Sequence, residues 1–210
     1  MHACARLLVA TIGAAACSAA MAHHPADGAM PATAVDGLLS GLAHPIIEID
    51  HLLFMLAAAV LAGLSGVSAG RLVTVLAVFA LAGVLGTSLR VPGVGLPLLE
   101  PLLGGTLLAI AFFLWRGRVP AFGKALMMSA GAGVLHGQAY GEAVIGAEAT
   151  PVIWYLVGLL VVQCALLVLV ALMVRRLETP YHPQMSTAAR WLSSIAAAVG
   201  LWLLGAAVLA

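Results

Sequence analysis

The sequence contains very few charged residues. Asp, Glu, Lys and Arg make up 8% of the 210 positions, whereas hydrophobic residues make up 63%. A soluble domain carries roughly a quarter charged residues, so this chain cannot build a polar surface and must be covered by lipid. The net charge is only +1 and the basic residues form no patch, which argues against nucleic acid as a partner. The composition predicts an all-α membrane protein with no sizeable soluble domain.

The N-terminal segment has the pattern of a secretory signal peptide. Arg6 supplies the positive region, residues 7–16 form a short apolar region, and residues 20–22 read Ala-Met-Ala. This pattern is typical of a cleavable signal, so we expect residues 1–22 to be removed and residues 23–210 to form one domain. An uncleaved membrane anchor is the alternative.

Cysteine is also scarce. Removal of the signal would take away Cys4 and Cys17 and leave only Cys164, inside an apolar run. A disulfide within one mature chain and a cysteine-based metal motif are then excluded. The sequence has no nucleotide-binding motif either, so any transport would be driven by a gradient rather than by ATP.

Six segments are long and apolar enough to span a bilayer, which takes about 20 residues as a helix. Short breaks that contain turn-forming or charged residues separate them. The sequence therefore predicts a polytopic membrane helix bundle with six transmembrane helices after a cleaved signal peptide. The expected spans are 45–64, 72–89, 96–115, 121–140, 151–174 and 188–209.

The distribution of Lys and Arg predicts the orientation. If the mature N-terminus lies outside, the inner loops carry seven basic residues and the outer loops carry only Arg90. Because basic residues favour the cytoplasmic side, we expect a bacterial inner-membrane protein with both mature termini in the periplasm. The seven inner residues are Arg71, Arg116, Arg118, Lys124, Arg175, Arg176 and Arg190.

Most acidic residues then fall on the outer side, where they would concentrate cations. The alternative is that acids simply fill the loops that basic residues avoid. The histidines at positions 23 and 24 would follow the cleavage site and add a candidate chelating group there. The outer acids are Asp27, Asp36, Glu100, Glu142 and Glu148.

The first predicted span carries ionisable residues at helical spacing. Pro45 suits a first helical turn, with His44 at the cap. Positions 44, 48, 51 and 55 then share one face, occupied by His44, Glu48, His51 and Met55. Ionisable groups within a span are costly and indicate function. For Glu48, a solvated acid in the first turn is the alternative, and Met55 is better explained as a core residue.

This combination of side chains suits a divalent transition metal. Neutral imidazole together with carboxylate binds nickel, cobalt, zinc or copper. Asp50 lies on a different face of the helix from His51 and would orient a ligating histidine of a neighbouring span through its second ring nitrogen. A purely structural buried pair of Asp50 and His51 is the alternative.

The fourth predicted span carries a second cluster. His136 and Tyr140 are four residues apart and share a face. Glycines at 133, 137 and 141 form a smooth face for close helix packing, from which we infer that spans one and four pack together with His136 facing the first cluster. Glu142 follows in the outer loop, as a further metal ligand or a solvated acid. A structural His136 bonded to a backbone carbonyl is the alternative.

These motifs resemble the HupE/UreJ family. The resemblance rests on His44-Pro45-x4-Asp50-His51 and on His136-Gly137-x-Ala139-x-Gly141-Glu142. It implies a nickel or cobalt permease, or an accessory protein for hydrogenase or urease metallation, with His44, Asp50, His51 and His136 as functional residues. The chain differs from the family pattern at Glu48, where Gly is frequent, and at Tyr140, where a second His is frequent.

From the residues and the resemblance together, we expect a secondary permease that imports nickel. It would not be an enzyme and would hold no permanent cofactor; its partners would be the ion, the bilayer and metallation factors of hydrogenase or urease. The rivals are a membrane-embedded zinc hydrolase, for which Ser129 and Glu142 are available, and a metal-binding accessory protein that does not transport. The candidate metal ligands are His44, Glu48, Asp50, His51, His136 and Glu142.

Overall fold

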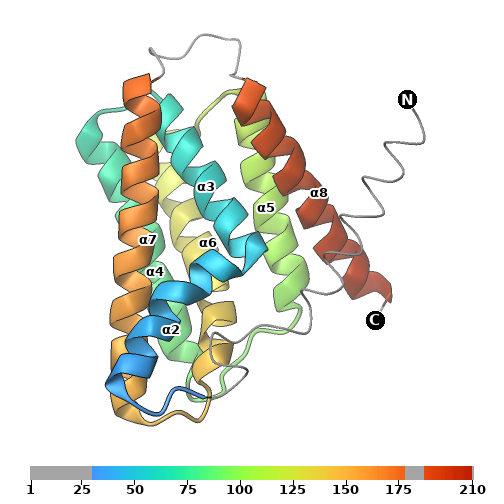
Figure 1. Ribbon diagram of the computed structural model, residues 1–210. Coiled ribbons are helices and arrows are strands. Elements are labelled where there is room, and N and C mark those ends of the chain that lie inside the picture. The colour runs from blue at the N-terminus through green and yellow to red at the C-terminus, as the bar shows by residue number, and fades with distance from the viewer. Residues whose placement is uncertain (1–29, 178–186, 210) are drawn as a thin grey trace.

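The computed structural model describes residues 30–177 and 187–209, and this part of the chain is a helical bundle without strands (Figure 1). The predicted signal peptide, His23 and His24, and the loop that contains His182 lie outside the described residues. The helices are α2 (Ala34–Ile47), α3 (Ile49–Leu64), α4 (Ala69–Arg90), α5 (Leu99–Arg116), α6 (Phe122–Tyr140), the short 3₁₀ helix η1 (Gly141–Val144), α7 (Ala149–Leu177) and α8 (Thr187–Leu209).

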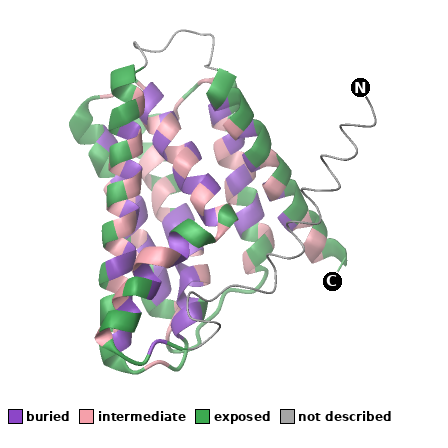
Figure 2. Cartoon of the chain, in the orientation of Figure 1, coloured by how far each residue is buried: buried purple, intermediate pink, exposed green. Residues whose placement is uncertain are grey.

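The outer surface of the bundle is apolar, as a bilayer requires. Buried residues line the inner faces of the helices, whereas large hydrophobic side chains such as Leu81, Leu169 and Trp191 are exposed on the outside (Figure 2). Such an extensive exposed apolar surface marks contact with lipid in a membrane protein. The chain is therefore a multi-pass helical membrane protein, as its composition predicted.

Helices α4, α5, α7 and α8 are each long and apolar enough to cross a membrane, and α2 with α3 would together form a fifth span. Helix α6 runs through the bundle beside them (Figure 1), but its glycines, Lys124, His136 and Gln138 lower its hydropathy. The expected bounds of spans two to six agree with α4 to α8 to within three residues. Six spans remain a prediction.

The first predicted span is not one straight helix. It is broken at Glu48, and α2 and α3 meet there at an angle of 73°. Pro45 lies inside the last turn of α2, so its expected place in a first helical turn is wrong, and so is the place of His44 at an N-cap. Proline lacks the N–H that would continue the helical bonding, and three residues later Glu48 takes up an extended conformation.

Helix α2 begins well before residue 45, where the first span was predicted to begin. The Thr33 hydroxyl accepts a hydrogen bond from the Asp36 backbone N–H at 3.1 Å, and the Asp36 carboxylate accepts one from the Thr33 N–H at 3.0 Å. This capping box begins the helix eleven residues before Pro45. The segment between them contains Asp, Ser and two glycines, so hydropathy alone did not mark it as part of a span.

Glycines decide which helices lie in contact. A Cβ at Gly41 of α2 would collide with the Tyr155 carbonyl of α7, and one at Gly137 of α6 would collide with the Gly83 carbonyl of α4. The Thr87 hydroxyl donates a hydrogen bond that is shared between the Gly83 and Gly137 carbonyls, at 2.9 and 3.0 Å. The glycine face of α6 therefore packs against α4, and the inference that it packs against the first span is wrong.

The basic residues gather at one end of the bundle. The helix ends and the loop that carry the seven residues assigned above to the inner side all lie at the same end in Figure 1, whereas Arg90 ends α4 at the opposite end. The seven basic residues that were predicted to share one side of the membrane are thus grouped at one end of the folded bundle. Which end faces the cytoplasm remains a prediction from the positive-inside rule.

Candidate metal centre

The break between α2 and α3 lies near the middle of the bundle (Figure 1), and three ionisable side chains come together there. Glu48 occupies the break, His44 lies one turn before it in α2, and His51 lies one turn after it in α3. Glu48 Oε1 is 3.3 Å from His44 Nε2, and Glu48 Oε2 is 3.1 Å from His51 Nε2. The ligand atoms of the three residues all lie within 4.8 Å of one another.

Three of the four ring nitrogens of His44 and His51 are buried without a hydrogen-bond partner among the described residues. His44 is 3% exposed and His51 is fully buried. Both nitrogens of His44 and Nε2 of His51 have no hydrogen-bond partner among the described residues, and the two Nε2 atoms contact Glu48 only as ion pairs. A buried polar atom without a partner costs about 1–3 kcal/mol, so such a concentration calls for a ligand that the three residues share.

The spacing of these atoms fits a single transition-metal ion. Metal–nitrogen and metal–oxygen bonds of about 2.0–2.2 Å place neighbouring ligand atoms about 3.0–3.4 Å apart. The two separations at Glu48, 3.3 Å from His44 to Oε1 and 3.1 Å from His51 to Oε2, fall in that range if both carboxylate oxygens face the ion. Two imidazoles and one carboxylate are also a donor set that suits nickel, cobalt, zinc or copper. Among the described residues three protein donors converge, which leaves coordination positions for water.

His136 contacts the ring nitrogen of His51 that does not face Glu48. Its Nδ1 lies 2.9 Å from Nδ1 of His51, and its Nε2 lies 3.0 Å from the Thr106 hydroxyl of α5. Asp50 also approaches His51 from this side, with Oδ2 3.7 Å from Nδ1. The expected meeting of His136 with the first cluster is confirmed for His51, although α6 packs mainly on α4.

Aromatic rings enclose the histidines. The Tyr140 ring is 5.4 Å from the His44 ring and 4.4 Å from the His51 ring, centre to centre, and the Tyr155 ring is 6.1 Å from that of His44. The Tyr155 hydroxyl donates to the Tyr140 carbonyl at 2.8 Å, which fixes α7 against the end of α6. Both tyrosines are fully buried, so water reaches the cluster mainly past Glu48 and Asp50, whose side chains are partly exposed.

The remaining candidates are not among the three residues whose ligand atoms converge. Glu142 pairs with Arg90 at 2.7 Å, and its side chain is 55% exposed. Met55 is fully buried in the core, as expected. Asp50 lies beside its own neighbour His51 rather than beside a histidine of another span. Thr106 was not identified from the sequence as part of the site. Its hydroxyl in the middle of an apolar span was the signal that could have indicated a polar partner there.

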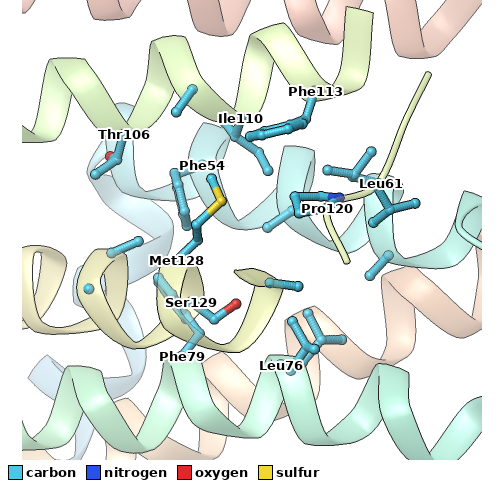
Figure 3. Close-up of a pocket in the computed structure, with 18 of the residues that line it drawn as sticks. Phe54, Leu61, Leu76, Phe79, Thr106, Ile110, Phe113, Pro120, Met128 and Ser129 are labelled. Carbon is cyan, nitrogen blue, oxygen red and sulfur yellow. The ribbon is translucent and has the colours of Figure 1, made fainter. Parts of the chain in front are cut away.

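An apolar cavity of about 330 Å³ adjoins the cluster (Figure 3). It begins at Phe54 and Thr106 and extends between α3, α4, α5 and α6 to Pro120. Ser129 is the other hydroxyl on its wall, so the nucleophile considered for a hydrolase faces an apolar cavity. Phe54 packs on the His136 ring at 4.4 Å and on the Phe79 ring at 5.3 Å, centre to centre, which separates the cavity from the histidines.

Comparison with known proteins gives one result. The family described as HupE / UreJ protein matches residues 9–203, which is nearly the whole chain and includes the histidine cluster, His136 and the cavity. Comparisons with curated proteins and with solved structures gave no match. The extent of the family match decides the assignment, and the chain belongs to the HupE/UreJ family.

Proposed function

We propose that this protein is a secondary permease that imports a divalent transition-metal ion, with nickel as the preferred ion. One observation carries the proposal: the buried Nε2 atoms of His44 and His51 converge on Glu48 and have no hydrogen-bond partner among the described residues. Membership of the HupE/UreJ family supports a nickel or cobalt transporter, or an accessory role in metallation. The donor set suits nickel and cobalt equally, so the choice of nickel rests on the family.

The helix break supports transport rather than storage. Secondary transporters commonly build their substrate sites where a membrane helix is interrupted, because free backbone groups and mobile half-helices meet there. Glu48 occupies this interruption and its carboxylate lies at the N-terminal end of α3, where a negative charge is favoured. A small change in the 73° angle between α2 and α3 would move His44 relative to His51 and so loosen the site.

Three protein ligands also suit an ion that has to leave again. Conduction requires binding that is favourable but not too strong. The ion would keep part of its water shell at the partly exposed side, next to Glu48 and Asp50. Import follows from the predicted orientation, in which the acidic end faces the periplasm, and a gradient would drive it because the sequence has no nucleotide-binding motif.

The test is nickel uptake in bacteria that lack other nickel importers, with urease activity as a second readout. We expect the wild-type chain to raise uptake above the empty vector and His51→Ala to abolish the gain. His182→Ala is the matched control, because the sequence places this histidine in a loop between the last two predicted spans. No gain with the wild-type chain, or full uptake with His51→Ala at equal expression, contradicts the permease.

Metal analysis of the purified protein separates the permease from its rivals. A permease binds its ion exchangeably, whereas a zinc hydrolase retains about one zinc per chain through purification, because its catalytic metal is a permanent part of the active site. An accessory protein would bind nickel but give no uptake in sealed vesicles.

A further inference from the structure

The two nitrogens of the His51 ring have different surroundings. Nε2 faces Glu48 Oε2 at 3.1 Å without a hydrogen bond, whereas Nδ1 contacts His136 at 2.9 Å. His136 in turn contacts Thr106 through its other nitrogen at 3.0 Å. Three helices thus contribute to one line of side chains, Thr106 from α5, His136 from α6 and His51 from α3, that ends at the metal cluster.

The direction of the protons along this line follows from Thr106. Its hydroxyl has one hydrogen, which it donates to the Leu103 carbonyl at 2.7 Å. Toward His136 the hydroxyl oxygen must therefore accept, so His136 carries its hydrogen on Nε2. A neutral imidazole has one N–H, which makes Nδ1 of His136 an acceptor and leaves His51 as the donor through its own Nδ1.

Asp50 favours the same arrangement. Its Oδ2 lies 3.7 Å from Nδ1 of His51, and a negative oxygen stabilises an N–H more than a lone pair at that distance. Glu48 Oε2, 3.1 Å from Nε2, favours a hydrogen on Nε2 by the same argument, so the hydrogen bonds that begin at Thr106 decide between the two nitrogens. With the hydrogen on Nδ1, the Nε2 lone pair of His51 is free and directed into the cluster. This is the arrangement in which a metal-binding histidine donates its second nitrogen's hydrogen to an outer partner.

We propose that Thr106, acting through His136, is a positioning residue that holds His51 in the Nδ1–H tautomer, so that its Nε2 is ready to bind the ion. His136 is then a positioning residue too and not a metal ligand, because both of its nitrogens are engaged, with His51 and Thr106. The proposal deepens the permease above and rests on it for the identity of the ion.

Removal of the Thr106 hydroxyl would reverse the direction of hydrogen-bond donation between His136 and His51. In Thr106→Val the Nε2–H of His136 loses its acceptor inside an apolar environment, which favours transfer of that hydrogen to Nδ1. His136 would then donate to Nδ1 of His51, and the hydrogen of His51 would move to Nε2, where it blocks the metal site. Losses of such outer partners typically reduce metal affinity about 10- to 100-fold.

The first experiment needs no variant. Nitrogen NMR of histidine-labelled, metal-free protein at a pH at which the rings are neutral distinguishes the two tautomers by their chemical shifts; His51→Gln and His136→Gln assign the signals. We expect His51 as Nδ1–H and His136 as Nε2–H. An Nε2–H or doubly protonated His51 in the wild-type protein overturns the proposal.

The second experiment measures Ni²⁺ affinity of the purified full chain by titration calorimetry. We expect Thr106→Val to bind about 10- to 100-fold more weakly and Thr106→Ser, which keeps the hydroxyl, to stay within about threefold of wild type. Thr74→Val is the matched control, because Thr74 makes the same kind of bond to a backbone carbonyl, Gly70 at 2.8 Å, on an exposed surface. Equal affinities of Thr106→Val and wild type overturn the proposal.

These outcomes separate the two proposals. A wild-type chain that binds Ni²⁺ with the expected tautomers but gives no uptake contradicts the permease and supports the positioning role. Uptake that depends on His51, together with the opposite tautomer at His51, supports the permease and overturns the positioning role. A wild-type chain that binds no divalent ion overturns both.

Discussion

The histidine cluster and the apolar cavity lie next to each other and differ in almost every property. The cluster has ionisable side chains, ring nitrogens without hydrogen-bond partners among the described residues, and a helix break. The cavity is bounded mainly by unbroken stretches of α3, α4, α5 and α6, with almost no polar atoms. The rings of Phe54, Phe79 and His136 separate them. The proposed ion would have ligands on one side of these rings and none on the other, so we expect the rings to act as a barrier to the ion.

The largest expected effect is at the cluster itself. Glu48→Gln removes the negative charge that two histidines share, while the size of the side chain is kept. Loss of a ligand should exceed the roughly 100-fold upper range for outer-sphere changes in metal affinity, so Ni²⁺ binding by calorimetry and uptake in cells should both disappear. Affinity within tenfold of wild type would show that Glu48 is only a solvated acid.

The next effect concerns the barrier between the two regions. Phe54→Ala should lower stability by about 3–5 kcal/mol and join the cavity to the histidines. We expect nickel to leak across proteoliposome membranes down its own concentration gradient, even when no second gradient is imposed to drive transport. The reason is that water can then enter between the cluster and the cavity. Phe112→Ala is the control, since Phe112 is 55% exposed on the same bundle. A Phe54→Ala variant that still transports nickel but shows no leak would contradict the role of Phe54 as a barrier.

A smaller effect is expected where α6 packs on α4. Gly137→Ala places a Cβ against the Gly83 carbonyl, and overpacking of this kind costs about 1–3 kcal/mol. It should lower the midpoint of thermal unfolding and shift His136, one residue away. Gly131→Ala on the same helix has nothing within 4 Å of the new Cβ and should be neutral or slightly stabilising. Equal unfolding midpoints would argue against the close α4–α6 contact.

The smallest effect is expected at Glu142, which the sequence suggested as a ligand. Its partner is Arg90, and an exposed ion pair contributes about 0–1 kcal/mol. Glu142→Gln should leave Ni²⁺ affinity within about twofold of wild type. A tenfold loss at low and high salt alike would instead place Glu142 among the ligands and widen the cluster toward the end of α6.

Much of the site could be predicted because it depends on local spacing. His44, Glu48 and His51 were grouped because positions 44, 48 and 51 share one face of a helix, and they also lie together at the break. His136 was found through the cost of an ionisable group in an apolar segment. Thr106 was missed because a lone threonine in a span usually bonds to its own helix, and only the approach of α6 gives its hydroxyl oxygen a second role.

Hydropathy is a local property, so the sequence by itself determined that the chain is a helical membrane protein, where helices α4 to α8 begin and end to within three residues, and which ionisable residues lie inside apolar segments. The tertiary structure decided the rest, because it depends on contacts between distant segments. The capping box at Thr33 and the close fit of Gly41 on α7 place α2 across the bundle and the break at Glu48. The packing of α6 on α4, rather than on the first span, places His136 behind His51, where it contacts Thr106 instead of Glu48.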